Sequence, residues 1–258
     1  MTTEAAADAA EWLTDDLFYG GALRLLQPKR GHRFGGDAAL LVAAARSRLA
    51  PGDRIVDLGA GVGAVGLALV MLGAGRALLV EIDPALSALS VRNAARNGLG
   101  ERVQALAGDV SEAGRDPESG AGAAQLVVMN PPFDDASRFR ASPDAAKARA
   151  HVDGGSVAPD WIAAAGRLLE PGGALVLIHR PEASPELLAA LEVGFGDVRL
   201  LAVHPRVGSP AARVLIAARK GGFGPPGEKP PLAMHGPDGR FTPEADAAQR
   251  GRAALDLS

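Results

Sequence analysis

Four residues at the end of an apolar run, Asn130-Pro131-Pro132-Phe133, carry the most specific chemistry in the sequence. They follow residues 124–129, which have the composition of a buried strand, and two prolines cannot continue a hydrogen-bonded sheet. The chain must therefore leave the sheet after Asn130, at the carboxyl end of the strand. In open α/β sheets that edge is where ligands bind. We expect an amide oxygen, proline carbonyls and an aromatic ring to lie together there.

This set of groups suits a flat base that carries an amino group. The amine on adenine is a poor nucleophile because its lone pair is delocalised into the ring. Two acceptors, the Asn130 side-chain oxygen and the Pro131 carbonyl oxygen, would bind both amine hydrogens and aim the lone pair at an incoming methyl group. Phe133 would stack on the base, a contact worth roughly 1–3 kcal/mol. Taken alone, however, the tetrapeptide is also an ordinary strand-ending turn.

A second cluster of chemical groups follows the predicted strand at 54–58. There the sequence Asp57-Leu58-Gly59-Ala60-Gly61-Val62-Gly63 enters a helix, and its glycines allow a sharp turn and a close approach to a ligand. Glu81 ends the next predicted strand, where a carboxylate can bind two ribose hydroxyls. The predicted cofactor-binding residues of these two strand ends are Asp57, Gly59, Ala60, Gly61, Gly63 and Glu81.

Either an adenosine-bearing methyl donor or a dinucleotide would suit this cluster. The spacing Gly61-x-Gly63-x-x-Gly66 formally matches the dinucleotide fingerprint. Charge separates the two ligands, because Asp57 would sit beside the pyrophosphate of NAD and repel it. S-adenosylmethionine (SAM) has no phosphate and carries an ammonium and a sulfonium, so the same carboxylate can help to bind it. The sequence favours SAM.

Three further positions could complete the cofactor site. Asp109 closes the third predicted strand, where it could accept a hydrogen bond from the cofactor's adenine amino group, with Ile82 and Val110 sandwiching the ring. Capping of the turn that follows is the competing role of Asp109. Asp37 is expected chiefly to cap the next helix, with a contact to the methionine end of SAM as its second role. Asn130 is counted among the cofactor contacts as well as the catalytic residues.

A basic group follows the tetrapeptide in the chain. It consists of Arg138, Arg140, Lys147 and Arg149, which would rim the same sheet edge and contact either a phosphate backbone or only solvent. The net charge of −3 gives the whole chain no signature of nucleic-acid binding. The histidines share no metal-ligand spacing, so no metal site is expected.

The elements that must position these residues alternate through the middle of the chain. Strands are predicted at 54–58, 77–82, 103–107, 124–129 and 174–178, and helices between them at 64–72, 84–97 and 161–169. Near-continuous apolar strands separated by helices indicate a parallel sheet covered on both faces. Two last strands, 198–204 and 213–218, have no helix between them and suit an antiparallel hairpin. This arrangement resembles the sheet of SAM methyltransferases more than a dinucleotide-binding sheet.

From about Leu17 onwards the sequence resembles the bacterial tRNA1(Val) adenine-37 N6-methyltransferase family, a branch of the class I "small-domain" methyltransferases. The resemblance rests on the stretch 31–38, the loop 57–63, the strand ends at 81–83 and 108–109, and Asn130 to Phe133. It implies an α/β, Rossmann-like fold with a mostly parallel seven-stranded sheet, a terminal antiparallel hairpin and helices on both faces. It also implies SAM as donor, S-adenosylhomocysteine as product, and tRNA adenine 37 as target. Phe133 stands where the family has Tyr, which preserves stacking.

Other functions stay open on the sequence alone. Related families with an Asn-Pro-Pro-aromatic turn methylate guanine N2 in ribosomal RNA or a glutamine amide in a protein. An NAD-dependent oxidoreductase and a non-catalytic RNA-binding module are more remote alternatives.

The 258 residues suffice for one large domain with appendages. We expect an N-terminal extension over 1–36, the methyltransferase domain over 37–220, and a Pro/Gly-rich tail or surface arm over 221–258. The extension holds a predicted strand at 23–27, and the domain opens with a helix from Asp37 to about Leu49. The chain has no cysteine, and its first residues lack a basic segment followed by an apolar core. We therefore expect a cytoplasmic protein that has RNA as its partner and is not attached to a membrane.

Overall fold

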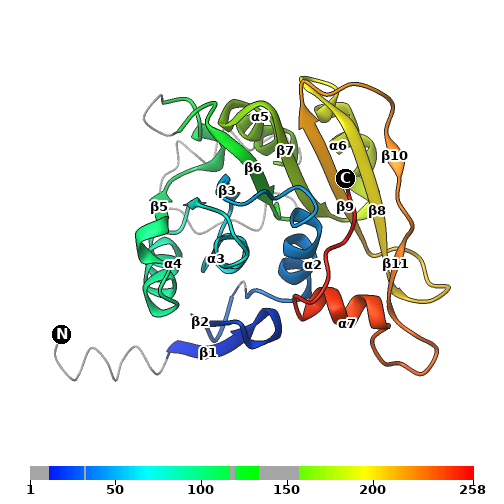
Figure 1. Ribbon diagram of the computed structural model, residues 1–258, viewed down its shortest axis with the longest axis horizontal. Helices are drawn as coiled ribbons and strands as arrows, with labels where there is room; N and C mark the ends of the chain where they lie inside the picture. The colour runs from blue at the N-terminus through cyan, green and yellow to red at the C-terminus, as the bar shows by residue number, and fades with distance from the viewer. Residues whose placement is uncertain (1–11, 32, 117–119, 134–156) are drawn as a thin grey trace.

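The computed structural model describes residues 12–31, 33–116, 120–133 and 157–258. Within them, nine strands form one sheet in the order β10-β8-β9-β7-β6-β3-β4-β5, with β11 also paired to β8 (Figure 1). The strands span β3 (Arg54–Leu58), β4 (Arg76–Glu81), β5 (Val103–Ala107), β6 (Ala124–Met129), β7 (Leu169–His179), β8 (Phe195–Arg206), β9 (Arg213–Lys220), β10 (Gly227–Glu228) and β11 (Leu232–His235). The predicted seven strands are β3 to β9, and the predicted antiparallel pair is β8 with β9.

Helices cover both faces of the sheet, as the continuous apolar strands predicted. The helices are α2 (Gly36–Ala45), α3 (Ala64–Met71), α4 (Pro84–Arg96), α5 (Ala158–Leu168), α6 (Ser184–Leu191) and α7 (Pro243–Gln249). One apolar cluster joins α2 and α3 to one face of the strands, and a second joins α5 and α6 to the other face. Alternate residues of a single strand therefore belong to different clusters: Val128 faces α2, whereas Val127 faces α5.

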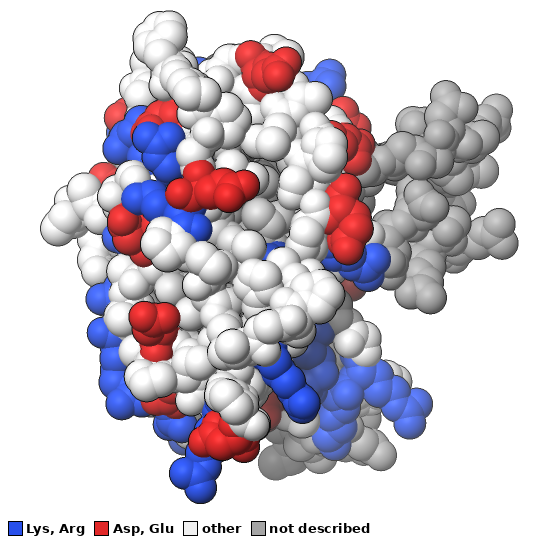
Figure 2. Space-filling model, turned by 90° about the vertical axis from the view of Figure 1, so that its right-hand side faces the viewer, with Lys and Arg blue, Asp and Glu red and all other residues white. Residues whose placement is uncertain are grey.

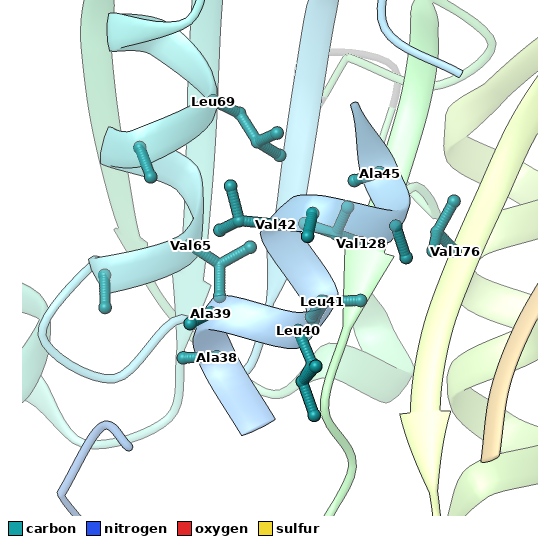
Figure 3. Packing of buried hydrophobic residues seen from close by; sticks show 14 of the residues in the cluster. Ala38, Ala39, Leu40, Leu41, Val42, Ala45, Val65, Leu69, Val128 and Val176 are labelled. Atoms are coloured by element: carbon teal, nitrogen blue, oxygen red, sulfur yellow. The ribbon is translucent and has the colours of Figure 1, made fainter. Parts of the chain in front are cut away.

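Helix α2 is the most completely buried helix of the first face. Its residues from Ala38 to Ala45 are all buried, because α3 lies on one side and the sheet on the other. Figure 3 shows Val42 of α2 lying beside Val65 and Leu69 of α3, with Val128 and Val176 of the strands on the other side of α2. Small alanines allow this close approach. The helix ends at Ala45, four residues before the predicted end at Leu49.

The register of the parallel strands brings their carboxyl ends to one edge of the sheet, the lower edge in Figure 1. Leu58 of β3 pairs with Met129 of β6, and Met129 pairs in turn with Leu177 of β7. The segments that follow β3, β4, β6 and β7 therefore lie side by side. The β8–β9 turn lies at the same edge, because β9 begins opposite the end of β7 with Val214 paired to His179. We call this edge the carboxyl edge.

The N-terminal hairpin, β1 (Leu13–Phe18) with β2 (Leu23–Pro28), docks on α4 through side-chain amides. Asn93 accepts a hydrogen bond from the Leu26 amide at 2.8 Å and donates to the Leu26 carbonyl at 2.9 Å. Asn97 makes the same pair of bonds with Arg24, at 3.0 and 2.9 Å. Each amide thus satisfies strand groups that would otherwise need a neighbouring strand.

Residues 221–258 do not form the tail or surface arm that their composition suggested. They add β10 and β11 to β8, and α7 then packs on α2 with Ala245 and Ala248 buried. Leu257 is fully buried, and the Leu255 amide donates to the Ala43 carbonyl at 2.9 Å. The segment is therefore part of the folded unit. Among the described residues, no helix has the length and apolar character that crossing a membrane requires.

Candidate functional site

Asn130 is the first residue after β6 at the carboxyl edge. Its side-chain oxygen is buried and accepts no hydrogen bond from any described residue. A buried acceptor left without a donor costs about 1–3 kcal/mol, so most proteins satisfy such groups. Pro131, which follows, is buried and has no N–H to offer. The side-chain oxygen of Asn130 is therefore available to a hydrogen-bond donor that lies outside the described residues.

Phe133 is half-buried, and its ring is held by groups from β7 and β9. The His179 ring meets it edge-on, with centroids 5.0 Å apart and an interplanar angle of 81°. The Arg213 guanidinium carbon lies 4.8 Å from the centre of the Phe133 ring, and that of Arg180 lies 5.5 Å away. Cations at such distances are attracted to the face of an aromatic ring. The predicted stacking residue is thus bordered by two positive charges.

Asp37 connects this ring to helix α2, and it does so differently from the expected cap. The N-cap of α2 is Gly35, and no side chain caps the helix. The cap prediction was wrong because the helix begins at Gly36, which places Asp37 inside the first turn. Its carboxylate instead accepts a 2.8 Å hydrogen bond from Nε of Arg213 and forms an ion pair with that residue. The contact holds the start of β9 against the start of α2.

His179 ends β7 and is buried. Neither ring nitrogen meets a described partner at hydrogen-bonding geometry. Burial is the main cause that lowers the pKa of His179; the nearby Arg180 and Arg213 charges lower it further, and the Arg180 backbone opposes them. The ring is therefore neutral near pH 7 and serves as a flat wall beside Phe133.

Sequence reasoning missed His179, Arg180 and Arg213 as parts of this site. The first two could have been found by the rule that singled out Asn130, because they too follow the carboxyl end of a predicted apolar strand. Arg213 gave a weaker signal. It opens the last strand of a hairpin, and only the antiparallel pairing with β7 brings it to the carboxyl edge.

The glycine loop after β3 has the sharp turn that its sequence predicted. Gly59 and Gly61 have φ values of +70° and +55°, in the left-handed region that favours glycine. A Cβ atom on Gly59 would also lie 2.5 Å from Cη2 of Trp161, which projects from α5. A Cβ atom on Gly61 would meet nothing within 4 Å, so the backbone of this residue faces open space.

Glu81 ends β4 and reaches this loop with its carboxylate. One oxygen accepts a 2.8 Å hydrogen bond from the Gly61 amide, and the other accepts one of 3.0 Å from the Asp83 amide. An ionised carboxylate has about four acceptor positions, so each oxygen retains one for a hydroxyl group. Glu81 and Gly61 therefore lie together, as a ribose site would require.

Asp57 lies deeper than the other predicted cofactor residues. Its carboxylate accepts a 2.8 Å hydrogen bond from the Gly66 amide, inside α3. The pKa of Asp57 is raised to about 7, chiefly by burial; the Gly66 hydrogen bond partly opposes this rise, and the negative charge of Glu81 adds to it. A Cβ atom on Gly66 would lie 2.3 Å from a methyl carbon of Leu79, so this glycine permits the close packing of α3 on β4. A direct contact of Asp57 with SAM stays a prediction.

Asp109 lies beside Glu81, because the Gly108 amide donates to the Glu81 carbonyl at 2.9 Å. The Asp109 carboxylate accepts a 2.9 Å hydrogen bond from the Ser111 amide, which is the capping role weighed against a ligand contact. Val110 is buried, whereas Ile82 is 57% exposed. An exposed isoleucine next to two carboxylates could cover one face of an adenine ring.

The structure does not test the basic residues that were predicted to contact RNA. Arg138, Arg140, Lys147 and Arg149 lie outside the described residues. Across the part of the chain that the structure covers, no three His, Asp or Glu side chains are grouped as metal ligands would be.

Comparison with known proteins supports the protein family that the glycine loop and the strand-end residues indicated. Residues 35–206 match the family model described as the methyltransferase small domain. The chain belongs to this family. The family assignment confirms the enzyme class, a methyltransferase, and the class I fold predicted from the sequence.

Individual relatives of this methyltransferase differ in the acceptor that their names state. A tRNA1(Val) (adenine(37)-N6)-methyltransferase of Aeromonas hydrophila is 31% identical over 172 residues, which are 65% of this chain and 69% of that one. A ribosomal protein L11 methyltransferase of Pelotomaculum thermopropionicum is 34% identical over 127 residues, 49% of this chain but only 36% of the relative. The crystal structure of a predicted O-methyltransferase from Agrobacterium tumefaciens superposes with a TM-score of 0.69 at 30% identity, covering 85% of this chain and 98% of that one.

Proposed function

We propose that this methyltransferase transfers a methyl group from SAM to the N6 amine of an adenine in RNA, with adenine 37 of a tRNA as the favoured target. The observation that carries the proposal is the buried Asn130 side-chain oxygen, which accepts no hydrogen bond from any described residue. It lies at the carboxyl edge beside an aromatic ring and follows the strand next to the glycine loop. An amino nitrogen is the group that such an acceptor would bind.

The residues at the ends of β3, β4 and β5 fit a bound SAM molecule. Gly61 offers an uncovered backbone, Glu81 offers carboxylate oxygens for ribose hydroxyls, and Ile82 offers an exposed apolar side chain. Asp109 would receive the adenine amino group, and Asp37 would lie towards the amino-acid end. When bound, SAM supplies an electrophilic methyl group on a positively charged sulfur.

The residues after β6 would bind and orient the acceptor. The Asn130 oxygen and the Pro131 carbonyl would each accept one amine hydrogen, which draws the nitrogen out of conjugation with the ring. Phe133 would stack on the base, and the neutral His179 would close its side. No strong general base is required, because the amine becomes acidic once it is methylated and water can take the proton. Holding the reacting atoms in line provides most of the rate.

Two features favour RNA over a protein amide as the acceptor. Phe133 offers a stacking surface, which a flat base uses and a glutamine side chain does not need. Arg180 and Arg213 border that ring with positive charge, which suits a phosphate backbone. The similarity to the tRNA1(Val) enzyme of A. hydrophila, which spans two thirds of both chains, supports the same choice.

The test is methyl transfer from labelled SAM to separate tRNA, ribosomal RNA and protein fractions, followed by mass spectrometry of the nucleosides. We expect N6-methyladenosine in tRNA. Asn130→Ala should reduce kcat by about 10²-fold or more, because one of two groups that position the amine is lost. SAM binding and the melting temperature of the variant serve as controls for folding. Label in guanine or only in protein would contradict the adenine assignment, and undiminished transfer by Asn130→Ala would contradict the proposed role of Asn130.

A further inference from the structure

The C-terminal stretch 235–241 forms a hairpin at the carboxyl edge, the edge that carries Asn130. His235 ends β11 and pairs with Arg206 of β8, so its strand runs parallel to β8 and ends at the same edge. The chain then turns: the Gly236 amide donates to the Arg240 carbonyl at 2.9 Å, and His235 forms an antiparallel bridge with Phe241. In Figure 1 this turn lies below β11, next to the β8–β9 turn.

An aromatic pair stands on this hairpin. The rings of His235 and Phe241 are stacked, with centroids 4.6 Å apart and an interplanar angle of 24°. Nδ1 of His235 lies 3.0 Å from the Pro205 carbonyl oxygen, which fixes the histidine ring against β8. Phe241 is nevertheless 48% exposed. A large ring that is held in place and half open to solvent is the form that a stacking platform takes.

Positive charge lies between this platform and Phe133. Going along the edge from β7 to β11, the strand ends carry Arg180, Arg213 and Arg206, and Arg240 is on the hairpin itself. Arg206 and Arg240 are exposed. Two acidic residues near them are already engaged: Asp37 is paired with Arg213, and Asp238 accepts a hydrogen bond from the Arg240 amide within the turn. In Figure 2, which looks onto the β8 side of the molecule, Lys and Arg side chains gather mainly in the lower part.

The strand order sets the length of this surface. From β6 to β11 there are four strand intervals, β6-β7-β9-β8-β11, and neighbouring strands lie about 4.8 Å apart. His235, the β11 member of the aromatic pair, is therefore about 19 Å along the edge from the acceptor. At about 3.4 Å per stacked nucleotide, this span equals five or six nucleotides, or fewer in an extended strand.

We propose that the carboxyl edge from Phe133 to the His235–Phe241 pair binds a single-stranded segment of RNA. The target base would occupy the Asn130 end, a flanking base would stack on Phe241, and Arg206 and Arg240 would contact phosphates between them. The inference rests on the proposed RNA substrate. In it, the C-terminal segment binds nucleotides that flank the methylated base. Aromatic rings interleaved with positive charge are typical of surfaces that bind unpaired nucleic acid.

The first test compares two phenylalanines on opposite edges of the sheet. Phe241→Ala should weaken binding of a fluorescein-labelled anticodon stem–loop RNA by about 5- to 150-fold, the loss expected for one stacked base. Phe223→Ala is the matched control, because Phe223 is 93% exposed but follows β9 at the opposite edge of the sheet. Phe241→Trp should restore binding, since stacking is retained. In methyl transfer, Phe241→Ala should raise KM for RNA and leave kcat at saturating RNA unchanged.

The second test uses salt. Each phosphate contact to a single strand contributes about 0.7 to the slope of log K against log salt concentration. Arg206→Gln and Arg240→Gln should each reduce that slope by this amount, whereas Arg76→Gln, at the start of β4 on the opposite edge, should not. Phe241→Ala should leave the slope unchanged while weakening binding.

The outcomes separate this inference from the proposed function. If the wild type methylates adenine in RNA but Phe241→Ala binds RNA as tightly as Phe223→Ala does, the inference is overturned and the function stands. If the salt and stacking effects appear but the methyl group enters another nucleotide, the proposed RNA-binding surface is supported and the assignment of adenine as the target is wrong. If the wild type binds no RNA and Phe241→Ala instead impairs methylation of a protein, both are wrong.

Discussion

The buried Asp57 carboxyl group makes the stability of this protein depend on pH in a way that a single substitution should remove. Its pKa rises from an ordinary value of 3.8 to about 7, mainly because the side chain is only 3% exposed. Between these two values the native carboxyl is protonated and the unfolded one is ionised, so the native state holds more protons. The contribution of Asp57 to stability is therefore fully present below about pH 4 and is lost as pH rises towards 7. At 1.36 kcal/mol per pKa unit, the whole loss is about 4 kcal/mol.

Asp57→Asn keeps an oxygen that can accept the Gly66 hydrogen bond but cannot ionise. The variant and the wild type should have similar free energies of unfolding near pH 4, and the variant should be more stable by about 4 kcal/mol at pH 8. Urea denaturation followed by tryptophan fluorescence at a series of pH values measures this difference. Glu81→Gln tests the assigned cause, since it removes the charge that also raises the pKa of Asp57 and should move the transition to lower pH. A difference between Asp57→Asn and wild type that does not change with pH would refute the reasoning.

Two further predictions concern the loop and the acceptor site. Gly59→Ala should lower stability by about 1–3 kcal/mol more than Gly52→Ala, because both glycines have positive φ but only the first would place a Cβ atom against Trp161; equal melting temperatures would argue against this clash. Phe133→Tyr should retain RNA affinity, whereas Phe133→Ala should weaken it by about 1–3 kcal/mol in a binding titration, and equal affinity of the two variants would show that no base stacks there.

The central strands were predictable because burial on both faces demands continuous apolar runs, and glycines or prolines mark their ends. The predicted bounds of β3, β5 and β6 match the structure, and β4 differs by one residue at each end. Strand β7 was predicted too short. It begins at Leu169 and runs through Pro171-Gly172-Gly173, a sequence that indicates a turn. Its pairing with β6 shifts register between Ala124 and Leu126, which accommodates these residues.

The acceptor site was only partly predictable, because part of it depends on distant contacts. Asn130, Glu81 and the glycines follow strand ends, a position that local sequence reveals. The Asp37–Arg213 pair joins residues 176 positions apart, so no local pattern could indicate it. Strands β10 and β11 were missed for a different reason: they span two and four residues, too short for any periodicity, within a Pro/Gly-rich stretch.

The short strands β10 and β11 also cover the outer side of β8. Without them, β8 would present a long row of backbone amides and carbonyls to solvent, which is a template for pairing with another chain. Two short strands now occupy that row, and Pro230 and Pro231 separate them. A second molecule adding to this side would meet an interrupted strand that lacks amide donors at the prolines. The segment that extends the carboxyl edge thus also leaves the side of the sheet with a short, interrupted edge strand, the form that disfavours pairing with another chain.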